Sequence, residues 1–444
     1  MTSSREFFYV SDYLQNKTNA AKSSGVLGGQ WQYYFSDYIV YSFNHDDLRK
    51  KMSAFSSISV LPSCSNANGS HIGYTEVIEK REDNAFTRHL FTNFDNGYLD
   101  GPADAIIQES RTPYEHYASK EQERGKLKLM EEYNSNGIKV KSKSIDYEKD
   151  NTTATNYVRA MNASALSLCN TGSYYDEGIV YKIYTYELRP SCETETFYHP
   201  STGATLQTST TNYGYNDKKL IKSVSTVNSN NETFTTTFKY PSDFSTTYPY
   251  DEMVSKNILN PVVEKSEYKD STILLKTVIN NYDKFHSIFY APANLQIKNG
   301  TGLPVTRSVY AYDNKANLRE AVKDNTEKVV YLWAYNYQYP IAEIKNATYS
   351  QVTNIISETE LNAIAERKEP TYNDAKAINA LRTSLPGAMV TTYTFTPPQV
   401  KMNSMIDPRG VTTYYEYDWL DRLQFVMDAQ RKVIQFYDYN YQNQ

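Results

Sequence analysis

The sequence predicts an all-β protein: consecutive antiparallel hairpins and meanders in one long, curled sheet, with a small helical insert. The chain of 444 residues contains 42 Tyr, 17 Phe and 3 Trp, and aromatic side chains suit a pleated, half-buried surface. From Tyr74 onward, short runs of alternating side chains are separated by turn-forming residues, which is typical of strands joined by hairpins. The chain is also long enough to bury a substantial core.

This pattern divides the chain into four expected parts. They are an irregular N-terminal segment (1–73), a region of antiparallel hairpins with degenerate repeats (74–348), a helical insert (349–388) and a C-terminal meander of repeats (389–444). Within the hairpin region, turns are expected at Glu82–Asn84 and at Pro200–Gly203, because both stretches are rich in turn-forming residues and separate alternating runs.

Two short helices are expected in the insert, where the period of apolar residues changes from two to about 3.6. Ser357 lies three residues before Glu360, which is the spacing of a capping box at a helix N-terminus. Thr371 lies three residues before Asp374 in the same way. Because isolated helices of this length are marginal in water, their apolar faces should pack on the sheet or on each other.

Charge and cysteine content exclude several classes of function. The net charge of −5 and the pI of about 5.8 give no electrostatic reason to bind nucleic acid or an anionic membrane. No apolar run is long enough to span a bilayer. Cys64, Cys169 and Cys192 are too few and too widely spaced for a disulfide framework or a zinc site.

Two segments of the hairpin and meander regions repeat each other. Tyr415-Glu416-Tyr417-Asp418 matches Tyr310-Ala311-Tyr312-Asp313, and a leucine, Leu423 or Leu318, follows five residues after each Asp. Further on, "KVIQFYDY" (432–439) matches "KVVYLWAY" (328–335), and "YGYNDKKL" (213–220) is a weaker third copy. Each Asp is expected to end a strand and begin a turn, because its side chain can accept hydrogen bonds from nearby backbone N–H groups.

Each copy is therefore expected to form a small antiparallel meander beside the next. Tyr415 and Tyr417 should share one face of a strand, and Leu423, Phe425 and Met427 one face of the following strand. These faces should then align in cross-strand pairs.

The repeated unit resembles the YD repeat of the RHS (rearrangement hotspot) proteins. The residues that carry the resemblance are Tyr310, Tyr312, Asp313, Tyr415, Tyr417, Asp418, Arg422 and Leu423. Ala316 and Asp421 depart from the repeat, since a turn glycine is common at these positions. Residues 300–444 are similar to the C-terminal region of long RHS-like surface proteins of Bacteroidetes-type bacteria, and residues 74–300 are loosely similar.

The resemblance implies a sheet that curls into a wall or shell, with upstream repeats of a longer chain as partners. It also implies an extracellular or cell-surface location if this chain is part of a longer one. The N-terminus as written has no apolar segment of the kind found in signal peptides, so by itself it predicts a cytoplasmic protein.

A motif at Asp407–Gly410, "DPRG", resembles the Asp-Pro-x-Gly site at which toxin-carrying RHS proteins can cleave themselves. In that family a proline normally precedes the Asp by five residues, but here that position is Met402, and a further repeat follows Gly410. The stretch is therefore expected to be a tight turn in which Pro408 fixes φ and Gly410 allows a positive φ.

Catalytic, metal and cofactor sites have no clear sequence signal. None of the six histidines lies within four residues of another, so the spacing of a helical metal pair does not occur. Nucleotide-binding glycine motifs and hydrolase motifs are also missing from the sequence. No catalytic residue, no metal and no cofactor is expected.

The sequence thus predicts a non-catalytic structural or interaction segment, which associates with upstream repeats or with itself through its sheet edges. Two alternatives stay open. One is a carbohydrate-binding module, in which Tyr415, Tyr417, Tyr437 and Tyr439 would contact a glycan or partner, because aromatic rings stack on sugars; packing within the sheet is the expected role of these tyrosines. The other is a remnant toxin-carrier or processing core around Asp407.

Overall fold

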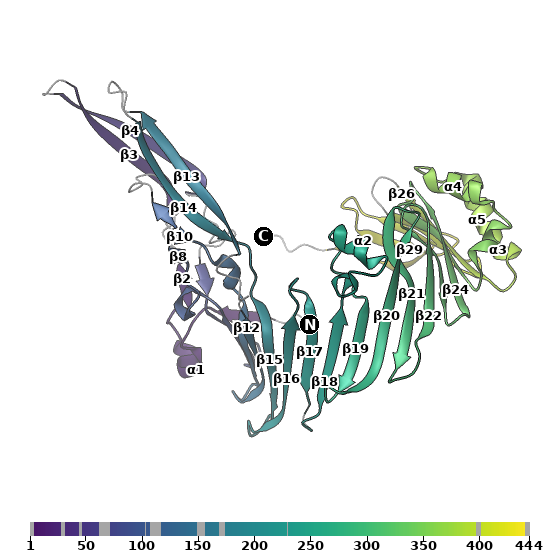
Figure 1. Ribbon diagram of the computed structural model, residues 1–444, viewed down its shortest axis with the longest axis horizontal. Helices are drawn as coiled ribbons and strands as arrows, with labels where there is room; N and C mark the ends of the chain where they lie inside the picture. Colours follow the sequence, from purple (N-terminus) through teal and green to yellow (C-terminus); the bar gives the residue numbers. More distant parts are fainter. Residues whose placement is uncertain are drawn as a thin grey trace. The chain divides into compact units, whose positions relative to one another are not determined.

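The computed structural model describes residues 4–27, 32–43, 47–61, 72–102, 104–106, 117–148, 156–167, 174–228, 230–396 and 401–439. It confirms the predicted fold class: one large antiparallel sheet contains 21 strands, and the helices are few and short (Figure 1). In the described part of the chain, no helix combines the length and the apolar character that crossing a membrane requires.

The strands of the large sheet are β1 (Arg5–Phe8), β6 (Glu76–Arg81), β7 (Phe86–Phe91), β11 (Leu127–Tyr133), β12 (Lys139–Glu148), β15 (Arg189–Tyr198), β16 (Thr205–Tyr215), β17 (Ile221–Val227), β18 (Thr233–Lys239), β19 (Glu264–Lys269), β20 (Ile273–Phe285), β21 (Phe289–Asn299), β22 (Val305–Tyr312), β23 (Leu318–Lys323), β24 (Glu327–Ala334), β25 (Tyr339–Lys345), β26 (Met389–Thr396), β27 (Lys401–Ile406), β28 (Thr412–Tyr417), β29 (Leu423–Met427) and β30 (Val433–Phe436).

Smaller sheets pair β2 (Gly25–Leu27) with β5 (Ile72–Tyr74), β3 (Gln32–Phe43) with β4 (Asp47–Leu61), β8 (Gly101–Pro102) with β10 (Tyr117–Ala118), and β13 (Tyr157–Ser167) with β14 (Tyr174–Tyr184) and β9 (Ala105–Ile106). The helices are α1 (Tyr13–Asn16), α2 (Tyr250–Ser255), α3 (Tyr349–Thr353), α4 (Glu358–Glu366) and α5 (Tyr372–Ser384), with short 3-10 turns η1 (Lys17–Asn19), η3 (Phe94–Asn96), η4 (Glu121–Glu123) and η5 (Pro241–Phe244).

The chain divides into two compact units, one formed by Met1–Gly214 with Ser223–Phe234 and the other by Tyr215–Lys222 with Thr235–Gln444. In the first unit, residues 1–73 are not irregular throughout, because β3 and β4 pair along a long antiparallel hairpin. The lack of a clear alternating pattern concealed this hairpin in the sequence.

A network of buried charges links β6, β7, β11 and β12 in the first unit. Arg88 donates to Glu76 (2.7 Å) and to Glu131 (3.0 Å), and Glu131 also accepts from Lys139 (3.0 Å) and Tyr133 (3.1 Å). Burial acts to raise the pKa of Glu131, but the hydrogen bonds from Lys139 and Arg88 lower it below its ordinary value. Burial, together with the Glu131 carboxylate, raises the pKa of Tyr133 to about 12. Each charge has a partner, which is the condition for a stable buried ion pair.

The next strands of the first unit have no hydrophobic core on either face. No residue from Arg189 to Gly214 is buried. On one face of β12 and β15, Lys141 pairs with Glu195 and Lys143 with Glu193. On the opposite face of β15 and β16, Thr–Thr contacts join Thr194 to Thr210 and Thr196 to Thr208. Cross-strand side-chain pairs therefore supply the stabilisation that a core would otherwise give.

The main core of the second unit lies between the helical insert and the sheet. Helices α3, α4 and α5 group beside β24 (Figure 1), and the buried side chains between these helices and the strands include Val330, Ile344, Leu361, Ile378 and Leu381. Both predicted helix starts are confirmed: the Ser357 hydroxyl accepts from the N–H of Glu360, and the Thr371 hydroxyl from that of Asp374. The third helix, α3, was not predicted.

A second, smaller core surrounds α2, which the sequence gave no reason to expect. Tyr250, Met253 and Val263 are buried together there. The Glu252 carboxylate accepts from Lys284 (2.7 Å) and from the hydroxyl of Tyr290, which fixes the helix to β20 and β21. This helix covers part of the sheet that the periodic pattern alone would leave open.

The turn between β24 and β25 contains three successive residues with positive φ, Tyr335 (56°), Asn336 (59°) and Tyr337 (61°). Left-handed backbone costs about 1–2 kcal/mol per non-glycine residue. Two of the N–H groups donate to the last turn of α4: Asn336 to the carbonyl of Arg367, and Tyr337 to that of Ala365, both at 2.9 Å. The strained turn therefore donates hydrogen bonds to carbonyls at the helix C-terminus, which have no donor within the helix.

The packing of the insert leads to a prediction about stability. Ile378→Ala should lower the free energy of unfolding by about 2–5 kcal/mol, because it leaves a cavity between α5 and the sheet. The matched control is Tyr372→Ala on the same helix, where the side chain is 82% exposed and little change is expected. Urea unfolding of both variants measures the difference, and equal midpoints would show that the insert does not pack as described.

Candidate functional site

One hairpin turn recurs along the chain, and it contains Asp313, Asp407 and Asp418, which the sequence singled out. At Asp418, Oδ1 accepts from the backbone N–H groups of Leu420 (3.0 Å) and Arg422 (2.9 Å). The fourth residue of the turn, Asp421, has a positive φ of 66°. We call this arrangement the Asx hairpin turn: an Asp or Asn whose Oδ1 accepts from the second and fourth following residues, with a left-handed residue between them.

In the described part of the chain, seven hairpins have this turn, led by Asn134, Asn216, Asn228, Asp313, Asp407, Asp418 and Asp428. Their left-handed residues are Gly137, Lys219, Asn231, Ala316, Gly410, Asp421 and Arg431. The sequence predicted this role for Asp313 and Asp418, and it predicted a turn at Asp407 from Pro408 and Gly410. It gave no signal for Asn134 and Asn228, because these turns lack the Tyr-x-Tyr that marks the stronger copies.

The candidate processing motif is one of these turns. Oδ1 of Asp407 accepts from the N–H groups of Arg409 and Val411, both at 2.9 Å, and Oδ2 accepts from the Arg409 side chain (2.9 Å). Gly410 has φ of 85°, and Pro408 lies inside the turn. The hydrogen bond from Val411, with the Arg409 guanidinium, holds the pKa of Asp407 below its ordinary value. Both carboxylate oxygens therefore already have partners within the turn.

The two strong repeat copies have the same local structure. Tyr312 pairs with Leu318, and Tyr417 with Leu423, each directly after a shift of register. The side chain four residues after the Asp also donates to Oδ2 in both copies: Asn317 to Asp313 (3.1 Å) and Arg422 to Asp418 (2.7 Å). Tyr310 and Tyr415, two residues before the paired tyrosines, occupy equivalent places opposite Ala321 and Val426.

Leu423, Phe425 and Met427 were expected to share one face of β29, but the shift of register places Leu423 on a different face from the other two. Leu423 pairs with Tyr417, but Phe425 pairs with Glu416 and Met427 with Tyr414. Gln424 is the extra residue of a β-bulge. A bulge changes which side chains share a face. Phe425 and Met427 therefore lie on the other face of the sheet from Tyr415 and Tyr417. Strict alternation, on which the expectation depended, does not continue through the bulge.

Aromatic donors beside these bulges bond to carbonyl oxygens of the preceding strand. Tyr417 Oη donates to the Met402 carbonyl at 3.2 Å. The pairing of β27 with β28 ends at Ser404 and Tyr414, so this carbonyl lies outside the paired residues. Equivalent bonds join Tyr147 to Leu127, Tyr240 to Ile221, Tyr312 to Pro292, Tyr439 to Leu423 and the Trp333 indole to Leu318. The hydroxyl therefore satisfies a carbonyl that the sheet ladder leaves open.

Cations stack on the rings of two of the four candidate glycan-contacting tyrosines. The Arg422 guanidinium lies 4.3 Å from the centre of the Tyr439 ring, and Lys401 lies 5.7 Å from that of Tyr417. Tyr415 is half-buried opposite Val426, and Tyr437 is half-buried just after β30, where its N–H donates to Gln424. Tyr415, Tyr417 and Tyr437 are half-buried, and Tyr439 is 40% exposed.

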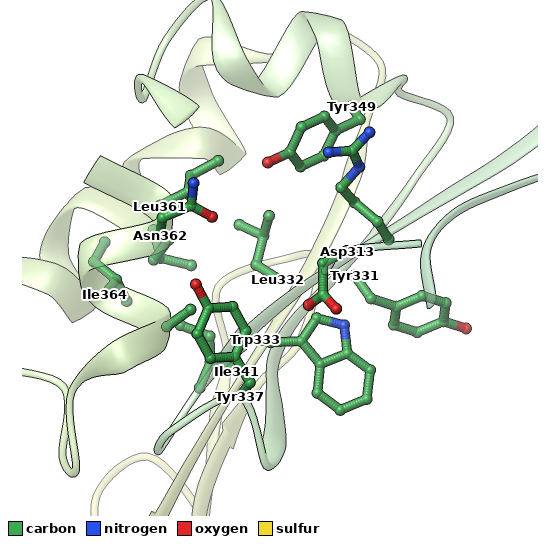
Figure 2. A pocket seen from close by; sticks show the side chains of 13 residues that line it. Asp313, Tyr331, Leu332, Trp333, Tyr337, Ile341, Tyr349, Leu361, Asn362 and Ile364 are labelled. Carbon is green, nitrogen blue, oxygen red and sulfur yellow. The ribbon is translucent and has the colours of Figure 1, made fainter. Parts of the chain in front are cut away.

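A pocket in the second unit, which the sequence did not indicate, opens between the sheet and the insert (Figure 2). It contains about 380 Å³ of empty space, part of it open to solvent. The residues that line it are Asp313, Arg319, Tyr331, Leu332, Trp333, Tyr337, Ile341, Tyr349, Leu361, Asn362, Ile364, Ala365 and Ile378. Apolar side chains of β24, β25 and the helices form its floor, and polar groups reach it from several elements.

Arg319 is the cation of this pocket. Its guanidinium lies 4.2 Å from the centre of the Tyr349 ring, and one Nη donates to Glu358 at 3.2 Å. Its Nε is buried and has no hydrogen-bond partner in the described structure. Burial raises the pKa values of Tyr337 and Tyr349, whose rings line the same opening.

Metal ligands do not gather anywhere among the residues that the structure describes. Of the histidines, His89, His199 and His286 are described and lie in separate strands or turns. Cys192 is a free thiol on β15. Outside the described residues lie His45, His71, His116, Cys64 and Cys169.

No protein-family model and no curated protein matches the chain. Among solved structures, a crystal structure of TcdB2-TccC3-TEV has a TM-score of 0.40 and 8% identity, over 80% of this chain and 20% of that one. A porin-like protein from Bacteroides uniformis has a TM-score of 0.20 and 13% identity, over 62% and 95% of the two chains. A Photorhabdus luminescens Tc holotoxin pore with a TccC3 mutation has 0.14 and 8%, over 82% and 23%.

The chain thus spans 20% and 23% of the lengths of the two toxin chains. With TM-scores below 0.5, none of the three similarities supports a conclusion about function.

The Asx hairpin turn can be tested at Asp418. Asp418→Ala should lower the urea midpoint, because two backbone N–H groups and Arg422 lose their acceptor. Asp418→Asn should retain most of the stability, since Asn134, Asn216 and Asn228 lead equivalent turns. If the Ala and Asn variants unfold at the same midpoint, the side chain does not stabilise the turn.

The same site predicts a dependence on pH. The hydrogen bond from Arg422 lowers the pKa of Asp418 below its ordinary value of 3.8, so the carboxylate stabilises the folded chain above that pH. This contribution is lost as the pH falls through the lower, folded-state pKa. The difference in urea midpoint between the parent and Asp418→Asn should therefore shrink between pH 5 and pH 2; a constant difference would contradict the assignment.

The tyrosine–carbonyl bond predicts a smaller effect. Tyr417→Phe should lower the free energy of unfolding by about 0.5–1.5 kcal/mol, because the Met402 carbonyl loses its donor while the ring stays in place. Tyr415→Phe is the matched control on the same strand, since no partner for its hydroxyl is found in the described residues. Urea midpoints that fall equally for both variants would exclude a specific role for the bond.

Proposed function

We propose that this chain is a non-catalytic structural and interaction segment, built as an RHS-like wall of YD repeats. The proposal rests on the hydrogen bonds that the repeat residues make with the backbone of the sheet. In the two strong copies, Asp313 and Asp418 accept from backbone N–H groups, and Tyr312 and Tyr417 donate to backbone carbonyls. These residues serve the sheet itself, which supports a structural role for the repeat.

The processing alternative receives less support from the geometry at Asp407. A carboxylate that acts on a nearby peptide bond needs a free oxygen within reach of it, but both oxygens of Asp407 accept hydrogen bonds within the turn. Arg409 also stabilises the ionised form of Asp407, whereas a general acid needs a proton to donate. We propose the turn as the role of this motif.

The glycan alternative is also less favoured at the four tyrosines. Stacking on a sugar needs an open ring face, but Arg422 lies over Tyr439 and Lys401 lies near Tyr417. Partner association has a more suitable surface in β30, where Val433, Ile434 and Phe436 are all exposed. An apolar strand of this kind favours addition of further strands from another chain or repeat.

Association through β30 is tested by sedimentation of the purified chain over a range of concentrations. We expect oligomers to increase with concentration, and Ile434→Lys, where the side chain is 64% exposed, to shift the distribution toward the monomer. Leu303→Lys is the control, since Leu303 is 87% exposed in the turn between β21 and β22. A parent chain that stays monomeric at high concentration would contradict self-association.

Intactness separates the structural role from the processing role. The purified chain should keep its full mass of 51.0 kDa on prolonged incubation, and Asp407→Ala should behave in the same way. Mass spectrometry makes the comparison. A C-terminal fragment that begins near Asp407, and that is lost in Asp407→Ala, would favour the processing core instead.

A further inference from the structure

The pocket between the helical insert and the sheet has an imbalance of hydrogen-bonding groups. Asp313 is the carboxylate that lines the pocket, and both of its oxygens already accept hydrogen bonds. Oδ1 accepts from the N–H groups of Lys315 (2.8 Å) and Asn317 (2.9 Å), and Oδ2 accepts from the Asn317 side chain (3.1 Å). The acceptor side of the pocket therefore needs no further donor, and a cationic ligand would find no free carboxylate at Asp313.

The donor side is incomplete. The Nε of Arg319 is buried without an acceptor, and a buried charged donor without a partner is more unfavourable than a neutral one. The half-buried Tyr337 hydroxyl and the exposed Asn362 amide are further polar groups at the opening, and the described residues offer them no hydrogen-bond partner. Figure 2 shows these two side chains on the same side of the opening, one from the turn after β24 and the other from α4.

The position of Arg319 is fixed before any ligand arrives. Its guanidinium stacks on Tyr349 and keeps one Nη on Glu358. An arginine held in this way presents its remaining N–H groups in a fixed plane, which suits the two oxygens of a carboxylate. The side chain remains partly accessible at 28% exposed, so a ligand can approach it from solvent.

The floor beside this arginine is apolar. Leu332, Leu361 and Ile364 are buried there, and the Trp333 ring lines the wall. Such a floor favours an organic body over a fully hydrated inorganic anion, because burial of apolar area stabilises the complex by about 25 cal/mol per Å². The combination of few polar groups and an apolar floor is typical of small-molecule sites.

We propose that this pocket binds a small carboxylate with an apolar or aromatic body. The carboxylate accepts from the accessible part of the Arg319 guanidinium and from the Tyr337 hydroxyl or the Asn362 amide, and the body lies on the floor of leucine and isoleucine side chains. This binding site is independent of the proposed structural role of the repeats, since none of its unsatisfied donors takes part in an Asx hairpin turn.

The test uses the full chain and three fluorinated probes of one shape: 4-fluorobenzoate, 4-fluorobenzyl alcohol and 4-fluorobenzylamine. Fluorine NMR follows the line width of each probe as protein is added. We expect saturable binding of the carboxylate, at least about tenfold tighter than binding of the alcohol or the amine. Equal binding of the three probes, or no saturable binding of the carboxylate up to about 10 mM, would overturn the proposal.

Variants locate the site. Arg319→Gln should weaken carboxylate binding at least about tenfold, while Arg307→Gln, which changes an arginine paired with Asp324 elsewhere in the unit, should leave it unchanged. Asn362→Ala provides a second variant at an exposed position of α4, so the test does not depend on the folding of Arg319→Gln. Unchanged binding in both pocket variants would show that the carboxylate binds elsewhere.

Discussion

Seven hairpins in the described part of the sheet depend on one local constraint, the hydrogen bonds from two backbone N–H groups to the Oδ1 of an Asp or Asn at the start of the hairpin. A hairpin of this form needs one left-handed residue, which is unfavourable for a side chain other than glycine. Glycine is present at Gly137 and Gly410, but Lys219, Ala316 and Arg431 adopt the same conformation. The Asx acceptor offsets that strain, so the turn can form without a glycine.

The turn also determines what happens in the strands beside it. In both strong copies the register shifts next to the tyrosine that precedes the Asp. On the other side of the same strand, the ladder with the preceding strand does not reach Pro292 or Met402. The hydroxyls of Tyr312 and Tyr417 bond to the carbonyls of these residues. The Tyr–Asp pair is thus one physical unit, in which the Asp stabilises the turn and the Tyr compensates for the open strand.

Local signals in the sequence were sufficient for the fold class, the capping residues Ser357 and Thr371, and the turns led by Asp313 and Asp418. Each of these depends on residues close together in the chain. The sequence could not reveal the network around Arg88, because Glu131 lies 43 residues away and reaches Arg88 only through strand pairing. The bulge at Gln424 was missed for a related reason, since alternation predicts faces only while the register is continuous. The pocket around Arg319 brings together side chains of β23, β24, β25 and the helices α3, α4 and α5, and no local pattern identifies it.

Polar side chains that have hydrogen-bond partners within the chain stabilise the sheet, whereas polar side chains without such partners remain free to bind a ligand. Between Arg189 and Gly214 no side chain is buried, and ion pairs and hydroxyl contacts across the strands take the place of a core. In the two strong repeats, Tyr312, Tyr417, Asp313 and Asp418 have partners within the sheet. An unmatched donor such as Arg319 Nε contributes nothing to either arrangement, although its burial is unfavourable. The contacts of Arg319 with Tyr349 and Glu358 join β23 to the helical insert, and they leave the buried Nε as the donor that the fold itself does not match.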